Sequence, residues 1–190
     1  MERSDRELVR ESRAGNAEAF RELVERYQRK VAAVALGMVH NREDALELTQ
    51  ETFVKAFENL GKFKGESSLY TWLYRIVVNL GIDFRRRERR HGTVSIEERA
   101  EAGAAELADD SVGAPLGDPF RELRSREVGA RVTDAINELT PDHKAVILLR
   151  EVEGLSYDEI SRVMQCSKGT VMSRLHYARK KLQSKLRDCL

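Results

Sequence analysis

Residues 156–186, SYDEISRVMQCSKGTVMSRLHYARKKLQSKL, decide the fold of the C-terminal part of the chain. Ser156 precedes Glu159 by three residues, which is the capping-box pattern that begins a helix. Residues 165–167 interrupt this short helix, and Ser167 has the side chain that an N-cap of a second helix needs. The apolar stripe of the second helix is formed by Val171, Leu175, Ala178, Leu182 and Leu186. A short helix, a tight turn and a long second helix predict a helix-turn-helix.

The charge of this unit points to a nucleic-acid partner. Between Ile160 and Arg187 there are eight basic residues and no acidic one. Such a surface suits a phosphate backbone, whose neutralisation releases counterions. Side chains off the apolar stripe would project into a major groove; they are Lys168, Thr170, Ser173, Arg174 and Tyr177. The alternative is an ordinary helical hairpin with a charged outer face, and the combined caps, turn, length and charge favour duplex DNA binding over it.

Helices are also predicted elsewhere in the chain. Phe120 to Leu139 forms one helix, and Thr140 followed by proline begins another that stops at Gly154. In the N-terminal part, helix starts are marked by the following residues: Ser4, Asn16, Asn41, and Ser67 or Ser68. Apolar residues there recur at three- and four-residue steps, and no segment alternates with period two. The predicted fold class is therefore all-α.

The fourth helix carries aromatic and basic residues off its apolar stripe. The aromatic and amide side chains are Tyr70, Trp72, Tyr74 and Asn79, and arginines crowd the end of the helix, from Arg85 to Arg90. Aromatic rings beside a basic track can bind single-stranded nucleic acid. The alternative places the aromatic rings in the core and the arginines at a solvated helix end, and composition alone favours it.

The net charge of +1 is the sum of three unlike segments. Residues 1–90 carry 18 basic and 15 acidic side chains, residues 91–118 carry 1 and 7, and residues 119–190 carry 14 and 10. The middle segment has few large apolar residues, so we interpret it as a flexible acidic linker. A linker of this length is unusual inside one compact domain. We therefore expect two small helical domains, at 1–90 and 119–190.

Several classes of protein are not expected. The longest apolar stretch, Val31–Val39, is far shorter than the roughly 20 residues of a membrane-spanning helix. No secretory signal is visible, so we expect a cytoplasmic protein with free thiols and no membrane insertion. The four histidines and two cysteines lack metal-ligand spacing, and no glycine-rich phosphate loop appears. We expect no enzyme activity, catalytic residue, metal, cofactor or small-molecule substrate.

Three runs, in chain order, resemble parts of one family of bacterial transcription proteins. Residues 44–57, DALELTQETFVKAF, resemble the core-polymerase-binding helix of sigma factors. Residues 63–79, with SLYTWLYRI at 68–76, are similar to the −10-reading segment of the extracytoplasmic-function group. Residues 148–160, LLREVEGLSYDEI, with GTV and SR within residues 169–174, resemble the −35-reading helix-turn-helix. The chain is identified by this resemblance as a member of the sigma-70 family, similar to its sigma-E subgroup.

The resemblance implies a function for each domain. Residues 1–90 would be sigma region 2, a helical bundle that binds core RNA polymerase (its β and β′ subunits) and melts the −10 element. Residues 119–190 would be sigma region 4, which reads the −35 duplex. The chain would thus direct promoter-specific transcription initiation without catalysing phosphodiester formation. Promoter DNA and an anti-sigma factor are further expected partners.

The same resemblance assigns individual residues. The polymerase-binding residues would be Asp44, Leu48, Gln50, Glu51, Phe53 and Lys55. The −10 DNA-binding residues would be Lys62, Phe63, Lys64, Ser67, Tyr70, Trp72, Tyr74, Asn79 and Arg86. The −35 DNA-binding residues would be Arg150, Ser167, Lys168, Thr170, Met172, Ser173, Arg174, His176 and Tyr177.

Two of these positions depart from the family pattern. Met172 stands where sigma-E-like members often have arginine, and His176 where an aromatic residue is common. Because methionine cannot make the bidentate guanine contact of arginine, we expect a different −35 sequence. The alternative function is a free-standing helix-turn-helix regulator that binds duplex operators as a homodimer. That alternative leaves the polymerase-like run and the aromatic helix without a role.

Overall fold

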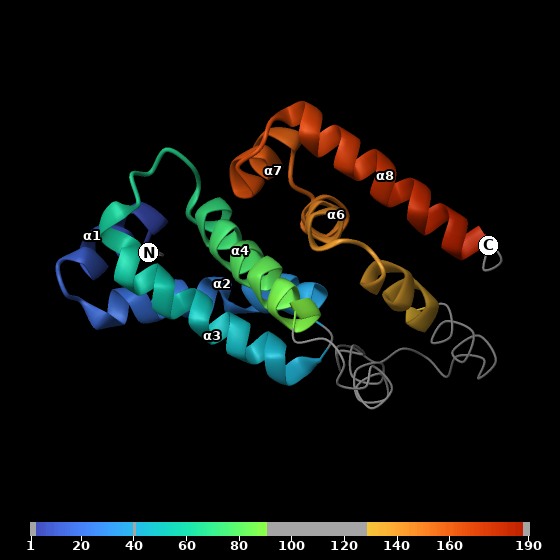
Figure 1. Cartoon of the computed structure of the whole chain (residues 1–190). Helices are drawn as coiled ribbons and strands as arrows, with labels where there is room; N and C mark the ends of the chain where they lie inside the picture. Colours follow the sequence, from blue (N-terminus) through green and yellow to red (C-terminus); the bar gives the residue numbers. More distant parts are fainter. Residues whose placement is uncertain (1–2, 40, 91–128, 188–190) are drawn as a thin grey trace, which may run out of the picture.

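The computed structural model describes residues 3–39, 41–90 and 129–187 (Figure 1). Within these ranges every regular element is helical, which confirms the predicted all-α class. No helix among the described residues is long and apolar enough to cross a membrane. The expected linker at 91–118 and the expected helix start at Phe120 lie outside the described residues.

The N-terminal helices begin at the capping residues that the sequence indicates. They are α1 (Asp5–Arg13), α2 (Ala17–Met38), α3 (Arg42–Asn59), the 3-10 turn η1 (Leu60–Lys62) and α4 (Leu69–Arg90). The side chains of Ser4, Asn16 and Asn41 accept hydrogen bonds from backbone amides of the first turns. Of the two serines that could begin α4, Ser68 accepts from the Thr71 amide at 3.3 Å. These caps fix where each helix starts.

The central element of the N-terminal bundle is α2, which contacts α1, α3 and α4. Its buried stripe includes Leu23, Val31 and Met38, and each such side chain contributes about 1.5–3 kcal/mol of burial. Helices α2 and α4 approach closely at Gly81, where an added Cβ would lie 2.8 Å from the Cβ of Met38. Helices α3 and α4 also contact each other, so the bundle holds both in fixed positions against α2.

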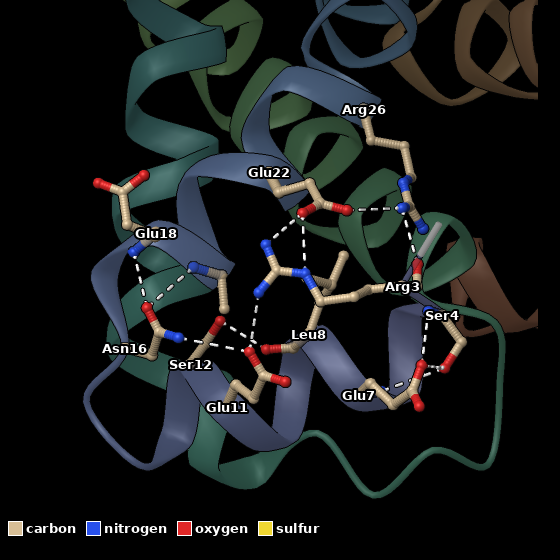
Figure 2. A network of polar contacts seen from close by, with 11 residues as sticks. Arg3, Ser4, Glu7, Leu8, Glu11, Ser12, Asn16, Glu18, Glu22 and Arg26 are labelled. Carbon is tan, nitrogen blue, oxygen red and sulfur yellow. Dashed lines mark hydrogen bonds and ion pairs between the residues drawn. The ribbon is translucent and has the colours of Figure 1, made fainter. Parts of the chain in front are cut away.

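A charged network fastens α1 to α2 (Figure 2). The Arg3 guanidinium donates to Glu11 at 2.9 Å and to Glu22 at 3.1 Å. Arg26 donates to Asp5 at 2.6 Å and to the second oxygen of Glu22 at 3.1 Å. Since both arginines and Glu22 are partly buried, the network is less screened than exposed ion pairs. It anchors the first helix on the outer side of the bundle.

The C-terminal part has the predicted helix-turn-helix. Residues 129–137 are helical and are followed by α6 (Pro141–Ile147), the π-helical turn η2 (Leu148–Val152), α7 (Tyr157–Met164) and α8 (Lys168–Leu186). Thr140, Ser156 and Ser167 cap α6, α7 and α8. Gln165 ends α7 in the left-handed conformation, with φ of 49°. The three residues 165–167 form the turn between the two helices of the motif.

The two domains pack against each other, which the sequence does not indicate. Helix α4 contacts α6 and α7, and α2 contacts α6 and η2. Buried residues of both parts form one continuous hydrophobic cluster. In Figure 1 the red helix α8 lies beyond α6 and α7 as seen from the N-terminal bundle. The C-terminal domain thus covers α4 with α6 and α7, while α8 faces away.

Candidate functional site

The residues expected to bind polymerase on α3 differ in burial. Leu48 and Phe53 are only 3% and 8% exposed, so they pack in the bundle core and do not belong to the surface. Gln50 is exposed, and Glu51 forms an ion pair with Lys55 at 3.1 Å. Asp44 exchanges hydrogen bonds with the N-cap Asn41, at 2.8 Å each, which ties it to the start of the helix. The surface part of the expected set is therefore polar.

The same helix also carries an exposed apolar stripe that was not predicted from the sequence. Leu46, Val54 and Phe57 are 51%, 56% and 57% exposed, and with Gln50 they lie at steps of four, four and three residues. We call these four residues the α3 stripe. Phe57 also contacts Phe20 edge-to-face, with 5.0 Å between the ring centres. A second apolar periodicity, opposite the core stripe, was the signal that could have revealed it.

The loop before α4 is fastened to the first helix. Arg13 donates to the Leu60 carbonyl at 3.0 Å and also to the Phe63 carbonyl. Lys62 and Lys64 are exposed, whereas Ser67 is half-buried. The Phe63 ring packs on Trp72 at 5.2 Å, and Trp72 is buried in the core. Trp72 is therefore a packing residue in this conformation, as the core alternative for the aromatics proposed.

The aromatic face of α4 is occupied by the C-terminal domain. The Tyr74 hydroxyl donates to Glu153, and the Tyr70 hydroxyl donates to Glu159. Burial, followed by the bond to Glu153, raises the pKa of Tyr74 above its usual range. The bond to Glu159 likewise raises the pKa of Tyr70. Both tyrosines are thus neutral hydrogen-bond donors that are already engaged.

Further along α4, the polar residues of the expected −10 set are accessible. Asn79 and Arg86 are exposed, and the Arg86 guanidinium lies 3.9 Å from Asp83. The expected −10 residues therefore fall into three groups: accessible polar side chains, core aromatics, and the tyrosine pair beneath the C-terminal domain.

The outer face of α8 presents most of the expected −35 residues. Met172 and Tyr177 are 55% and 61% exposed, and Ser173 and His176 are exposed beside them. The rings of His176 and Tyr177 meet edge-to-face at 5.6 Å. Met172 and His176 border an open hollow of about 450 Å³, whose lining is completed by Tyr157, Leu175, Arg179, Lys180 and Gln183. Ser167 and Thr170 are instead used in the N-cap, with their hydroxyls 2.9 Å apart.

Ion pairs tie the basic residues of α8 to the helices behind it. Their carboxylate partners come from preceding elements: Lys168 with Asp158 (2.6 Å), Arg174 with Asp142 (2.9 Å), Arg179 with Glu151 (2.7 Å) and Lys185 with Glu138 (2.8 Å). Arg150 is similarly engaged, donating to the Leu155 carbonyl at 2.7 Å and lying over the Tyr157 ring. The one-sided charge of the sequence is therefore partly balanced in the fold.

The described residues contain no group of three or more His, Cys, Asp or Glu side chains that could hold a metal ion. The geometry thus provides an exposed apolar stripe on α3, a polar track along α4 and an exposed reading face on α8. All three are suited to binding macromolecules.

Comparison with known proteins identifies the family of the chain. Residues 23–91 match the model of Sigma-70 region 2, and residues 130–182 match that of Sigma-70, region 4. The chain is 40% identical over 190 residues to the ECF RNA polymerase sigma-E factor of Haemophilus influenzae, covering 98% of this chain and 97% of the relative. It is 36% identical to the RNA polymerase sigma-H factor of Pseudomonas aeruginosa, covering 98% of this chain and 95% of the relative.

A solved structure shares the fold. CnrH, determined in complex with the cytosolic domain of CnrY, superposes with a TM-score of 0.68 at 26% identity, covering 97% of both chains. The two family matches lie on the two helical domains described above. The chain therefore belongs to the extracytoplasmic-function group of the sigma-70 family, as an alternative sigma factor that directs promoter-specific transcription.

Proposed function

We propose a division of this function among three segments of the chain. Residues 1–90 bind the β and β′ subunits of core RNA polymerase and open the −10 element, and residues 119–190 read the −35 duplex. Residues 91–118 connect them as an acidic linker. The polymerase supplies the catalysis, so this cytoplasmic chain is a non-enzymatic initiation factor.

The α3 stripe is the observation that supports polymerase docking most directly. An apolar face that is about half exposed along three turns of one helix is unusual for a surface without a partner. Gln50 lies within the stripe, and the Glu51–Lys55 pair lies beside it. A free-standing DNA-binding regulator would have no use for such a face on the domain that lacks the helix-turn-helix.

Promoter contacts are assigned according to exposure. Lys62, Lys64, Asn79 and Arg86 are accessible for the −10 strand. On α8 the base-reading residues are Met172, Ser173, His176 and Tyr177, because the first turns of a recognition helix enter the major groove. Met172 has an apolar side chain, which fits the methyl group of thymine. Arg174 holds α8 on Asp142, so we assign it to positioning and backbone contact rather than base reading.

An anti-sigma factor is the further partner that we propose. The similar protein CnrH was solved with the cytosolic domain of CnrY, and the two chains share their fold over nearly their whole length. Such a partner would compete with polymerase or promoter DNA for the surfaces described here.

The experiment tests the α3 stripe with a matched pair of variants. Val54→Asp places a charge on the stripe, and Val152→Asp places the same charge on an apolar residue of similar exposure, 62%, in the other domain. Tagged wild-type chain should retain core polymerase and direct transcripts with defined 5′ ends. Val54→Asp should lose polymerase retention, while Val152→Asp should keep it. Equal retention by both variants would refute docking through α3, and absence of any transcript with wild type would refute the proposed function.

A further inference from the structure

The segment between α3 and α4, made of η1 and residues 63–68, has few bonds of its own. We call it the −10 loop, because four residues assigned to the −10 strand lie in it: Lys62, Phe63, Lys64 and Ser67. The Phe63 amide donates to the Leu60 carbonyl at 3.1 Å, and the Ser68 and Thr71 hydroxyls bond at 2.6 Å. Between these ends, residues 64–67 form no hydrogen bond with any described part of the chain. Such a loop keeps a defined shape only through neighbouring elements.

Arg13, the last residue of α1, holds the −10 loop by its backbone. Its Nε donates to the Leu60 carbonyl at 3.0 Å, and its Nη2 donates to the Phe63 carbonyl. Leu60 begins η1 and Phe63 follows it, so the two carbonyls flank the turn. A guanidinium presents its donors in a rigid plane, so one side chain can fix both acceptors relative to α1. Because the donor is charged, these bonds are stronger than bonds between neutral groups.

The side chain of Phe63 holds the loop from the opposite direction. Its ring packs on Trp72 of α4, with 5.2 Å between the ring centres, and Trp72 is buried. Phe63 is thus held at its carbonyl by α1 and at its ring by α4. Lys62 and Lys64, on either side of it, are exposed. Two basic side chains therefore project from a segment whose central residue is attached in two places.

Helix α1 is itself attached firmly enough to support the loop. Leu8 is fully buried in the core, and Arg3, just before the helix, joins Glu11 of α1 to Glu22 of α2 (Figure 2). In Figure 1, α1 lies beside the turn that ends α3, and the two elements are in contact. The −10 loop is therefore supported by α2 through α1. This support lies outside residues 23–91, the part that matches Sigma-70 region 2.

The alternative role for Arg13 is a direct contact with DNA. Arg6, Arg10 and Arg13 are exposed at steps of four and three residues, so they share one face of α1. However, two donors of Arg13 are directed into the protein, toward the carbonyls of the loop. A phosphate contact adds affinity that depends on salt, whereas a positioning residue changes the geometry in which other groups meet the base. The two roles therefore lead to different measurements.

We propose that Arg13 is a positioning residue for −10 recognition. Through the Leu60 and Phe63 carbonyls it keeps the −10 loop in the shape that presents Lys62 and Lys64 to the single strand. Selectivity among −10 sequences then depends on α1, although α1 touches no base. The proposal rests on the proposed function, which assigns the loop to the −10 strand. Whether Arg13 orders the loop can be measured without DNA, and this keeps the two proposals separable.

The single tryptophan of the chain reports the order of the −10 loop. Trp72 packs against Phe63, so a loop released at the Phe63 carbonyl should uncover the indole. Arg13→Ala should therefore increase the quenching of Trp72 fluorescence by acrylamide. The matched control is Arg10→Ala, which removes the same charge from the same helix and should be quenched as wild type is. Arg13→Lys keeps the charge but not the paired donors, so it should give an intermediate value.

Selectivity is measured with the full chain bound to core polymerase. The template pool carries a randomised −10 element in one promoter, located by its transcript 5′ end, and a barcode in the transcribed part identifies each template. Arg13→Ala should lower the preference for the favoured −10 base by about fivefold, which is the low end of the cost of one mismatched base pair. Arg10→Ala should keep the full preference. Polymerase retention should be unchanged in both variants, since neither arginine lies on the α3 stripe.

Salt dependence separates positioning from direct DNA contact. The slope of the logarithm of the promoter-binding constant against the logarithm of salt concentration should be equal for wild type and Arg13→Ala. A slope smaller by about one in Arg13→Ala would assign Arg13 to a phosphate and overturn the proposal. Unchanged quenching, unchanged selectivity, or an equal loss of selectivity in Arg10→Ala would overturn it as well.

The remaining outcomes separate this proposal from the proposed function. If wild type with core polymerase gives no transcript, the proposed function fails, while the quenching of Trp72 still decides whether Arg13 orders the loop. If Arg13→Ala lowers the melting temperature of the chain, Arg13→Lys supplies the test at wild-type stability. Partial loss of selectivity in Arg13→Lys supports positioning by the paired donors, and full wild-type selectivity overturns it.

Discussion

The two helices assigned to promoter reading differ in what covers them. Helix α8 is packed from behind by α6 and α7 and exposes Met172, Ser173, His176 and Tyr177 to solvent. Helix α4 has its aromatic face packed beneath those same two helices. Helices α6 and α7 therefore support one reader and mask the other. Under the proposed assignments, the duplex-reading face is already exposed in this conformation, whereas the tyrosines of the expected −10 set are covered.

The largest expected effect separates the inner and outer faces of α8. Leu175 is 1% exposed and Met172 is 55% exposed, three residues apart. Leu175→Ala should lower the free energy of unfolding by about 2–5 kcal/mol because it leaves a cavity behind the helix, and Met172→Ala should change it by less than about 0.5 kcal/mol. Chemical denaturation measures both. Equal losses would show that α8 does not present a free outer face.

The second effect is a pH dependence of the contact between the two domains. Lys144 of α6 is buried in this contact, where its ammonium group donates to the Met38 carbonyl of α2 at 3.4 Å. Burial, with a smaller contribution from Arg85, lowers the pKa of Lys144 to about 7, and Glu88 opposes this shift. When the two domains separate, Lys144 regains its ordinary pKa near 10.5. Separation of the domains therefore takes up a proton at any pH between these two values. The state in which the two domains are in contact (the closed state) should therefore gain stability as pH rises from 7, by up to about 1.4 kcal/mol per pH unit.

The pH range in which the closed state gains stability has an upper limit, which is set by Tyr70 and Tyr74. Their pKa values are raised in the closed state, so the stability they contribute is present below pH 10 and is lost above it. The distance between the two domains can be measured with spin labels at Glu58→Cys on α3 and Gln183→Cys on α8, both exposed positions, in a chain with Cys166 and Cys189 replaced by serine. The fraction of chains with the short distance should accordingly increase between pH 7 and 9. Lys144→Met should abolish most of that increase. A closed fraction independent of pH in the wild-type chain would show that Lys144 is solvated or stays charged in the contact.

The third effect concerns the attachment of α8 to α6. The Arg174–Asp142 pair is partly buried at 2.9 Å, and its removal should cost about 1 kcal/mol of stability. Arg174→Ala should weaken binding to specific and nonspecific duplexes by similar factors. In a double-mutant cycle, the loss from Asp142→Ala should largely overlap with that of Arg174→Ala. A loss confined to one base pair of the −35 element would return Arg174 to the base-reading set.

The helix starts could be predicted from the sequence because an N-cap acts within a single helical turn. The caps at Ser4, Asn16, Ser156 and Ser167 need only the residues of one helical turn. The helix-turn-helix followed from such signals, and the resemblance supplied the family. Burial was harder to predict from the sequence. Leu48, Phe53 and Trp72 were assigned to binding but lie in the core. Their role depends on which stripe of each helix faces α2, and that is a property of the assembled bundle.

The contact between the domains could not have been read from the sequence. Gly37 and Leu148 are far apart in the chain and meet only where α2 packs against η2. The same holds for the carboxylate partners of α8, since Asp142, Glu151 and Asp158 lie in other elements. Periodicity reports the faces of one helix, but it contains no information on which distant residue will face them.

The smallest expected effect tests base reading on the exposed helix. If Met172 contacts a thymine methyl, replacing that thymine by deoxyuridine removes one methyl group and should weaken −35 binding by about 0.8 kcal/mol, or about fourfold. Met172→Ala should lose this sensitivity, while the neighbouring Ser173→Ala should keep it. Binding measured with each thymine of the −35 duplex replaced in turn locates the contact. If no position responds in wild type, or if Met172→Ala responds as wild type does, the exposed methionine does not read the base.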